Sequence, residues 1–313
     1  MRVTIDDIKT AAERIKGVAI RTPLIRNDRL DQLTGARVFV KAENLQRGGA
    51  FKIRGATNAI AALDPAVRQR GVLAFSSGNH AIAVATASKH FGIQAVIVMP
   101  SDAPRIKRET TERLGAEVIS FDRVKDNREA IGERISQERG LALIKPFDDP
   151  NVMAGQGTAG LEIGEEIAPD IVFAPASGGG LACGVAIALP HATMYAIEPE
   201  GHDDIRRSLI AGKIESNPPG IRSICDGLLV ERAGDITFPI LQSRFDGSLV
   251  LSDDATRRAM KFAFQHLKLV LEPSGAIALA AAMEGGVDIK GKTVAVLASG
   301  GNVDTEQFVK AIA

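Results

Sequence analysis

The sequence predicts an α/β protein built on parallel sheets. Short runs rich in β-branched residues alternate with stretches whose apolar residues recur at helical spacing. The strand-like runs are apolar throughout, which is typical of strands buried on both faces of a parallel sheet. Glycine and serine gather directly after several of these runs, where ligands bind in such sheets.

The predicted elements follow one another in a regular order. Strands are expected over residues 36–42, 71–77, 94–100, 116–122, 141–147, 170–176, 192–199 and 293–301. Helices are expected over residues 49–63, 80–92, 105–115, 127–140 and 254–268. A strand–helix–strand order repeated this often favours sheets with helices on both faces.

Charge and composition argue against nucleic acid or a membrane as partner. The 313 residues carry 38 basic and 38 acidic side chains, so no long-range field favours a polyanion. The two cysteines, Cys183 and Cys225, lie far apart in the sequence and form no CxxC pair, so a reducing compartment is the simpler interpretation. The N-terminus lacks the apolar segment of a signal peptide, and no apolar run is long enough for a membrane span. We therefore expect a cytoplasmic protein.

The helix predicted over residues 49–63 carries a lysine beside small residues. Its apolar residues form one stripe, and Lys52 lies off that stripe, next to Gly55 and Ala56. Neither neighbour is large enough to cover the amine. A solvated surface lysine is the ordinary interpretation. A reactive amine is the alternative, which the rest of the chain must support.

A glycine-rich turn in residues 176–189, ASGGGLACGVAIAL, follows a predicted strand and leads into a helix. The backbone N–H groups of Gly178, Gly179, Gly180 and Leu181 can surround an anion there, because a helix N-terminus favours negative charge. Cys183 takes the last glycine position of a GxGxxG pattern, which favours a single phosphate over a dinucleotide. A tight turn without ligand is the alternative.

The stretch GVDIKGKT, residues 286–293, matches the letters of a nucleotide-binding P-loop. A P-loop follows a strand and opens a helix. Here a predicted helix precedes the match and a predicted strand follows it, so we expect a plain turn.

Polar side chains crowd the turn SSGNH, which also lies between a strand and a helix. Ser76 or Asn79 could cap the helix, and His80 alone would ordinarily be a packed or surface histidine. Four polar side chains in one turn are more than a cap requires, so we expect a binding site there.

Taken together, AFKIRGA, SSGNH, SGGGL, EPSGA and SGGN resemble the fold-type II pyridoxal-phosphate (PLP) enzymes, and within them the serine/threonine dehydratase and serine racemase family. The resemblance runs from Glu43 to Asp304. It implies a two-lobed, tryptophan synthase β-like fold with the cofactor between the lobes. Residues 1–66 and 147–313 would form the larger PLP-binding domain, and residues 67–146 a smaller mobile domain. A homodimer is usual in the family.

The resemblance assigns the cofactor contacts residue by residue. Lys52 would bond the cofactor aldehyde, and Phe51 would pack against a face of its ring. Asn79 would bond the ring hydroxyl, and Ser299 would lie at the pyridine nitrogen. The loop Gly178, Gly179, Gly180 and Leu181 would hold the phosphate. A neutral serine leaves the ring nitrogen largely unprotonated, which favours expulsion of a β-substituent over a long-lived carbanion.

The implied reaction is loss of water from a 3-hydroxy amino acid, giving a 2-oxo acid and ammonia. Lys52 would take the α-proton from one face. Ser77 matches the opposite-face acid/base of racemases, so an amino-acid racemase is the alternative. The substrate carboxylate would meet the turn formed by Ser76, Ser77, Asn79 and His80.

Two further features concern a metal and the substrate. Glu198 and Asp204, with the backbone carbonyl of His202, match the family's divalent-cation site, which would take Mg²⁺, Mn²⁺ or Ca²⁺. Arg128 matches an arginine that can reach a distal carboxylate in racemase-like relatives. If it faces the site, a dicarboxylic substrate such as 3-hydroxyaspartate is favoured over threonine or serine. An exposed helix arginine is the alternative.

Overall fold

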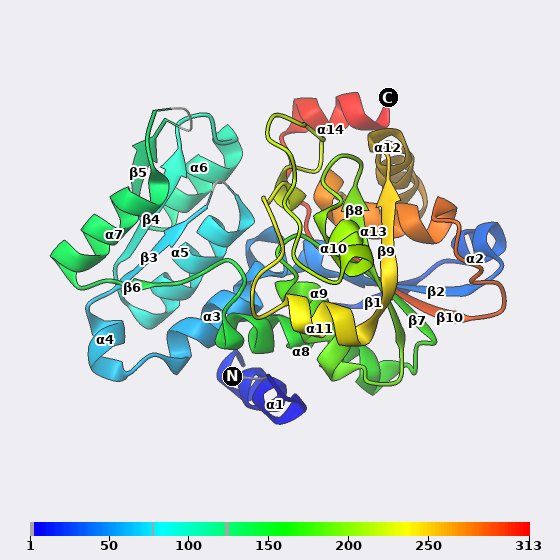
Figure 1. Ribbon diagram of the computed structural model, residues 1–313, viewed down its shortest axis with the longest axis horizontal. Coiled ribbons are helices and arrows are strands. Elements are labelled where there is room, and N and C mark those ends of the chain that lie inside the picture. Colours follow the sequence, from blue (N-terminus) through cyan, green and yellow to red (C-terminus); the bar gives the residue numbers. More distant parts are fainter. Residues whose placement is uncertain (1–2, 77, 123–124) are drawn as a thin grey trace.

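Two sheets, one in each of two lobes, organise the chain (Figure 1). The computed structural model describes residues 3–76, 78–122 and 125–313. The 6-stranded sheet consists of β1 (Leu24–Arg26), β2 (Arg37–Ala42), β10 (Thr293–Ala298), β7 (Ile171–Pro175), β8 (Thr193–Pro199) and β9 (Phe245–Leu251), in that spatial order. The 4-stranded sheet consists of β5 (Glu117–Phe121), β4 (Ala95–Pro100), β3 (Val72–Phe75) and β6 (Ala142–Leu143).

The predicted α/β class with parallel sheets is confirmed. Every neighbouring pair of strands in the two sheets is parallel except β1 with β2, which is antiparallel. Each strand-like run of the sequence contains one of the observed strands. The edge strands β1 and β9 were not predicted, because β1 is very short and β9 contains the strand-disfavouring pair Asp246 and Gly247.

Side chains of the central strand β10 alternate between two apolar layers. Val294 and Val296 face one layer, and Ala295 and Leu297 face the other, all fully buried. The first layer is formed with α2 (Asp28–Thr34), α12 (Asp253–Phe262), α13 (Pro273–Glu284) and α14 (Thr305–Ile312). The second is formed with α1 (Ile5–Arg14), α8 (Pro150–Glu166), α9 (Gly180–Ala188), α10 (Asp204–Ala211) and α11 (Phe238–Arg244). Burial on both faces explains the unbroken apolar run that marked this strand.

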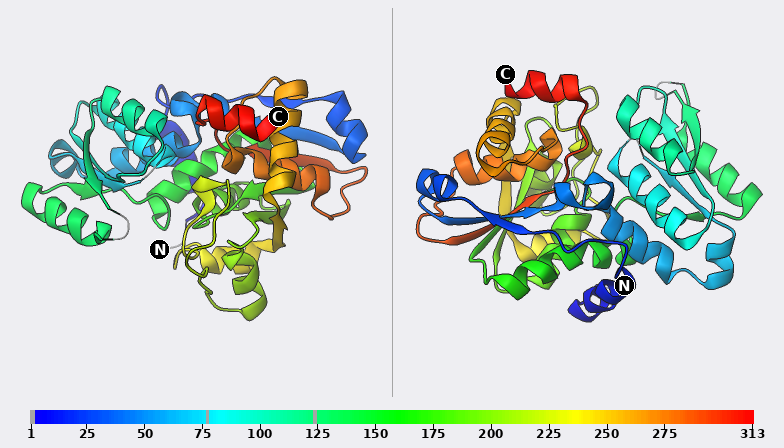
Figure 2. Two further views of the ribbon diagram at one scale, coloured as in Figure 1. Left: turned by 90° about the horizontal axis from the view of Figure 1, so that it is seen from above. Right: turned by 180° about the vertical axis from the view of Figure 1, so that it is seen from behind.

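The smaller lobe repeats this plan, and Figure 2 shows the two lobes side by side from two further directions. Its sheet packs against α3 (Lys52–Ala62) and α5 (Asn79–Phe91) on one face and α7 (Arg128–Arg139) on the other. The helix α4 (Pro65–Gln69) enters this lobe, and α6 (Arg105–Arg113) packs beside α5. The domain boundaries near residues 67 and 146 stay predictions.

Helix α3 contacts both lobes. Ile53 and Ile60 lie in the apolar cluster of the smaller sheet. On the opposite side, a Cβ on Gly55 would lie 2.4 Å from Gln156 Nε2 and 2.7 Å from the Val152 carbonyl oxygen of α8. The small residue next to Lys52 therefore allows α3 and α8 to pack closely. The sequence had suggested only that such residues leave the lysine uncovered.

A fully buried arginine fixes the first turn of α3. Arg54 has no exposed surface, and its Nε and Nη1 lie 2.8 Å from Glu43 Oε2 and 2.7 Å from Glu162 Oε1. Lys41 of β2, also fully buried, lies 2.5 Å from Glu162. Burial of these charges is tolerable only because they are paired. The network ties the start of α3, and with it Lys52, to β2 and α8.

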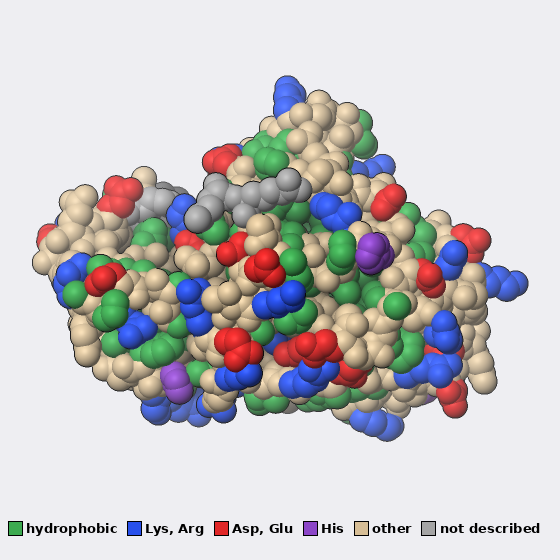
Figure 3. Space-filling model, turned by 90° about the horizontal axis from the view of Figure 1, so that it is seen from below, with side chains coloured by type: hydrophobic (Ala, Val, Ile, Leu, Met, Phe, Trp, Pro, Cys, Tyr) green, Lys and Arg blue, Asp and Glu red, His purple; other side chains and the backbone are tan. Residues whose placement is uncertain are grey.

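Acidic and basic side chains are interspersed on the face drawn in Figure 3. Among the residues that the structure describes, no helix is long and apolar enough to cross a bilayer.

Candidate active site

The predicted ligand-binding turns lie at the carboxyl ends of β3, β7 and β10. The start of α3 joins the end of β10, where the Phe51 N–H donates to the Ser299 carbonyl at 3.1 Å. Ala50 and Gly300 form an isolated antiparallel bridge at the same place. Lys52 and Ser299 are far apart in the sequence. Sequence order alone could not show that the start of α3, which carries Lys52, lies beside Ser299 at the end of β10.

Lys52 is half-buried, and its Nζ donates to the Pro146 carbonyl at 2.8 Å. Burial lowers the pKa of this amine to about 8. A substantial neutral fraction near neutral pH is what bond formation with an aldehyde requires. Phe51 packs against the apolar core of the larger lobe, and its ring centroid lies 5.1 Å from the Lys52 Nζ. Its contact with a cofactor ring stays a prediction.

The glycine-rich loop after β7 leads directly into α9, which begins at Gly180. Gly179 has a φ of 90°, a conformation that favours glycine. A Cβ on Gly178 would lie 2.1 Å from the Phe147 ring. The Thr237 hydroxyl donates to the Gly178 carbonyl at 2.6 Å, which turns this peptide group. The first N–H groups of a helix lack intrahelical acceptors, so Gly180 and Leu181 can donate to an anion.

One short segment, residues 144–147, links these parts of the site. The Ile144 carbonyl accepts from His80 at 2.9 Å, the Pro146 carbonyl accepts from Lys52, and Phe147 packs behind Gly178. The sequence predicted a strand through residue 147, but β6 ends at Leu143. The segment was therefore missed as part of the site, although Pro146 was a signal against a continued strand.

Asn79, in the turn after β3, is held at both ends of its amide by residues of the larger lobe. Its Nδ2 donates to Glu272 Oε1, and its Oδ1 accepts from Asn302 Nδ2 at 2.9 Å. The Ser76 hydroxyl accepts from the Gly78 N–H at 3.1 Å. Ser77, the expected opposite-face acid/base, lies outside the described residues. The sequence shows Glu272 only as part of the EPSGA motif and gives no sign of its contact with Asn79.

His80 is buried, and burial together with the Lys52 charge lowers the pKa of its imidazole to about 3. The ring is therefore neutral at physiological pH, and its Nε2 donates to the Ile144 carbonyl. It cannot supply a positive charge to a substrate carboxylate. The N–H groups at the start of α5 are better placed for that role.

Ser299 lies in the core of the site at 5% exposure, and its hydroxyl donates to the Ser274 carbonyl at 3.3 Å. Its oxygen keeps lone pairs that can accept a further hydrogen bond. A Cβ on Gly275 would lie 2.1 Å from the Gly300 carbonyl oxygen, so glycine is needed where α13 meets the end of β10. The amine with its lowered pKa, the N–H groups at the start of α9 and the buried hydroxyl fit a group with an aldehyde, a phosphate and a heteroaromatic ring.

The expected metal ligands occupy the loop between β8 and α10. Glu198 accepts from the Ile205 and Arg206 N–H groups at 2.8 and 2.9 Å, so it caps α10. Burial, with a contribution from the Asp204 charge, raises its pKa to about 7, and burial raises that of Asp204 to about 6. Asp204 Oδ1 accepts from Asn217, whereas its buried Oδ2 has no hydrogen-bond partner among the described residues.

This carboxylate pair fits a hard divalent cation, because both groups would be more easily ionised beside one. The backbone N–H of His202 donates to the Pro199 carbonyl at 3.0 Å, which forms a turn between Glu198 and Asp204. Within residues 3–76, 78–122 and 125–313, no group of three or more His, Cys, Asp or Glu side chains could hold a metal. A complete site would therefore need backbone carbonyl or water ligands.

Two other sequence predictions have different outcomes. Arg128 begins α7, but its side chain lies outside the described part of the structure, so its contact with a distal carboxylate stays a prediction. The P-loop-like stretch at residues 286–293 connects α13 to β10, as the reversed context predicted.

Comparison with known proteins identifies the family. Residues 15–300 match the family described as pyridoxal-phosphate dependent enzyme. The serine racemase of Schizosaccharomyces pombe is 42% identical over 311 residues, covering 97% of this chain and 96% of the relative. An L-threo-3-hydroxyaspartate ammonia-lyase of a Pseudomonas species is 42% identical, with 96% of each chain covered. The structure of maize serine racemase superposes with a TM-score of 0.94 at 39% identity, covering 100% of this chain and 97% of that one. A T.th. threonine deaminase structure superposes with a TM-score of 0.91 at 42% identity, covering 96% of this chain and 99% of that one. The chain thus belongs to the pyridoxal-phosphate dependent enzymes, in the fold-type II family of serine racemases and threonine dehydratases that its motifs predicted.

Proposed function

We propose that this enzyme is an ammonia-lyase that removes water from a 3-hydroxy amino acid and releases a 2-oxo acid and ammonia. The observation that carries the proposal is that the half-buried amine of Lys52, with a pKa of about 8, begins α3 directly after Phe51, whose N–H donates to the Ser299 carbonyl at the end of β10. The side chain at that strand end is a neutral hydroxyl. Names of the relatives support it, since ammonia-lyases acting on L-threo-3-hydroxyaspartate and L-threonine are 42% and 40% identical to this chain.

Each residue has a distinct task in this reaction. Bound pyridoxal phosphate withdraws electrons from the substrate α-carbon and so makes the α-proton acidic. Lys52 Nζ, neutral in part at physiological pH, accepts that proton. The N–H groups of Gly178–Leu181 hold the phosphate. Ser299 would leave the ring nitrogen without a carboxylate partner, which favours departure of the β-hydroxyl. The hydroxyl leaves as water by taking up the proton that Lys52 accepted.

The remaining contacts orient the substrate. The α-carboxylate meets the N–H groups at the start of α5, where the helix dipole favours an anion. His80 is neutral, so it positions by hydrogen bonding and not by charge. The site lies where the two lobes meet, and their closure excludes water from the reacting carbon.

We propose 3-hydroxyaspartate as the preferred substrate class. The proposal rests on Arg128, whose guanidinium would pair with the distal carboxylate, and on the two hydroxyaspartate ammonia-lyases among the relatives. Arg128→Ala should then lower discrimination between hydroxyaspartate and threonine, without lowering turnover of threonine. If discrimination between hydroxyaspartate and threonine is unchanged, Arg128 has no role in substrate binding and is an ordinary arginine of the helix surface.

A racemase is the second candidate, favoured by the serine racemases among the relatives. Racemisation needs an acid on the face opposite Lys52, and Ser77 is the residue proposed for it. If both reactions occur, Ser77→Ala should abolish inversion and leave elimination largely intact.

Three accompanying properties are also proposed. A divalent cation, Mg²⁺ first, would be held by Glu198, Asp204 and the His202 carbonyl. The enzyme would act as a homodimer in the cytoplasm, as the family resemblance suggested.

The proposal is tested by supplying the purified enzyme with pyridoxal phosphate and Mg²⁺ and measuring ammonia release. L-serine, L-threonine and the stereoisomers of 3-hydroxyaspartate form the panel, with Lys52→Ala as the inactive control. Ammonia and the matching 2-oxo acid should appear in equal amounts. Failure to release ammonia from every member of the panel would refute the lyase assignment.

A further inference from the structure

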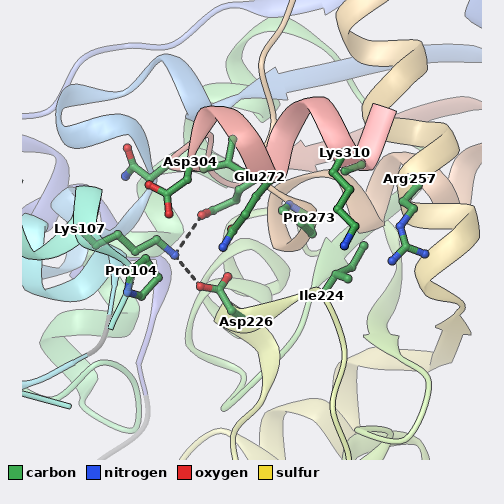
Figure 4. A pocket seen from close by; sticks show the side chains of 13 residues that line it. Pro104, Lys107, Ile224, Asp226, Arg257, Glu272, Pro273, Asp304 and Lys310 are labelled. Atoms are coloured by element: carbon green, nitrogen blue, oxygen red, sulfur yellow. Dashed lines mark hydrogen bonds and ion pairs between the residues drawn. The ribbon is translucent and has the colours of Figure 1, made fainter. Parts of the chain in front are cut away.

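A cavity of about 360 Å³ lies beside the site, between α6 of the smaller lobe and the larger lobe (Figure 4). Charged side chains of both signs line it. Lys107 extends from α6 toward Asp226 and Glu272. Asp226 belongs to a short 3-10 helix, Asp226–Leu228, and Glu272 occupies the position before the first residue of α13.

Lys107 makes a buried connection between the lobes. It is 4% exposed, and its Nζ lies 2.7 Å from Asp226 Oδ2 and 3.5 Å from Glu272 Oε2. Both partners belong to the larger lobe. Because a buried ammonium is costly unless it is paired, separation of the lobes would be opposed by the loss of both contacts.

The same lysine lies against the substrate-binding turn. A Cβ on Gly78 would lie 3.2 Å from Lys107 Cδ and 3.3 Å from its Nζ. Glycine at this position lets the lysine stem pass over the turn to reach the other lobe. The contact of Lys107 with Asp226 and Glu272 therefore depends on the position of the turn at Gly78 as well as on the position of α6.

Glu272 connects Lys107 to Asn79 in the site. Its Oε1 accepts from Asn79 Nδ2, so one carboxylate faces Lys107 with one oxygen and Asn79 with the other. Asn302 Nδ2 holds the opposite end of the Asn79 amide at 2.9 Å. With both ends fixed, the amide presents its second N–H in one orientation only.

The pKa values of Lys107 and Glu272 depend on each other. Burial raises the pKa of the Glu272 carboxyl to about 7, although the Lys107 ammonium acts to lower it. Burial acts to lower the pKa of Lys107, but Glu272 and Asp226 outweigh it and raise that pKa. Removing the lysine would therefore favour the protonated form of Glu272 and weaken its charge-assisted bond with Asn79.

We propose that Lys107 is a positioning residue that couples closure of the smaller lobe to the orientation of Asn79, through Asp226 and Glu272. When the lobes are together, the lysine holds Glu272, and Glu272 holds the Asn79 amide that would meet the cofactor ring hydroxyl. When they separate, Asn79 loses this support. The inference rests on the cofactor and not on the choice between elimination and racemisation.

Lys107→Met tests the coupling, because methionine keeps the unbranched stem and removes the charge. Lys89→Met, at an exposed lysine of α5 in the same lobe, is the matched control. The affinity of each apoprotein for pyridoxal phosphate is measured by fluorescence titration. Lys107→Met should bind the cofactor about tenfold more weakly, the effect of losing one charge-assisted contact. The control should bind it as the native enzyme does.

The absorption spectrum of the bound cofactor separates positioning from a general structural role. Lys107→Met and Glu272→Gln should shift the visible band in the same direction, because both weaken the support of Asn79. The double variant should show no larger shift than either single one. Amide exchange across α6 in the loaded enzyme should be faster in Lys107→Met than in Lys89→Met.

The opposite results would overturn the proposal. These are cofactor affinity and exchange equal to those of the control, or spectral shifts that add in the double variant. If Lys107→Met does not fold, Asp226→Asn takes its place, since the Asp226 side chain is 46% exposed and its loss should be tolerated. None of these readouts requires turnover, so a failure of the lyase assignment would be distinguishable.

Discussion

Raising the pH from 7 to 9 should increase the rate at which the apoprotein takes up pyridoxal phosphate about tenfold, and further increase should then cease. The reason is the Lys52 amine, whose pKa burial lowers from 10.5 to about 8. Lowering the pKa of a lysine increases its neutral fraction at a given pH, and only the neutral amine attacks an aldehyde.

The magnitude follows from the fraction of neutral amine. With a pKa of about 8, Lys52 is roughly 9% neutral at pH 7, 50% at pH 8 and 91% at pH 9. An ordinary lysine would rise from roughly 0.03% to 3% over the same range, about 100-fold and without a plateau. The shape of the profile therefore distinguishes the two cases without any absolute rate.

Rapid mixing of apoprotein with the cofactor, followed by its absorbance, gives this profile. Free Nα-acetyl-lysine serves as the reference amine, and Lys52→Ala shows whether the signal comes from Lys52. A midpoint at or above pH 10 would refute the assignment of Lys52 as a desolvated reactive amine. It would also remove the main physical reason for placing the chemistry at the start of α3.

Three other substitutions or conditions test the rest of the site. Arg54→Met leaves the buried Glu43 carboxylate without its cation, while Glu162 keeps Lys41. The substitution should lower the free energy of unfolding by about 3–5 kcal/mol in urea, and a loss below about 1 kcal/mol would contradict the buried network. Gly178→Ala should weaken cofactor binding because its Cβ would lie 2.1 Å from the Phe147 ring, and Phe147→Leu in the same chain should restore part of it. Mg²⁺ should raise the melting temperature more at pH 7.5 than at pH 5.5, because protons occupy Glu198 and Asp204 below their pKa values of about 7 and about 6. Asp204→Asn should remove this pH-dependent effect, and its persistence would place the cation elsewhere.

The sequence predicted the elements that a local pattern determines. Strands β7 and β10 are buried on both faces, so their apolar runs were unambiguous. The turns that follow them carry glycine because the local backbone needs it, as at Gly179 with its φ of 90°. These features can be predicted from residues that are close together in the sequence.

Features that depend on contacts between residues far apart in the sequence could not be predicted from it. Lys107 lies in RIKRETTER, which looks like an exposed amphipathic helix, yet it is buried against Asp226, 119 residues further along. Gly55 suggested space near Lys52, whereas it marks the contact of α3 with α8. Burial of a charge can be predicted only when its partner is known, and the partner comes from the fold.

The measurement that tests the central claim most directly is the ratio of elimination to inversion. The loaded enzyme, incubated with L-threo-3-hydroxyaspartate and separately with L-serine, is followed by chiral separation of the amino acid and by assay of the 2-oxo acid in the same sample. The lyase assignment predicts that the 2-oxo acid forms faster than the inverted amino acid with at least one of the two substrates. Inversion that outpaces 2-oxo acid formation with both substrates would contradict it and identify the enzyme as a racemase.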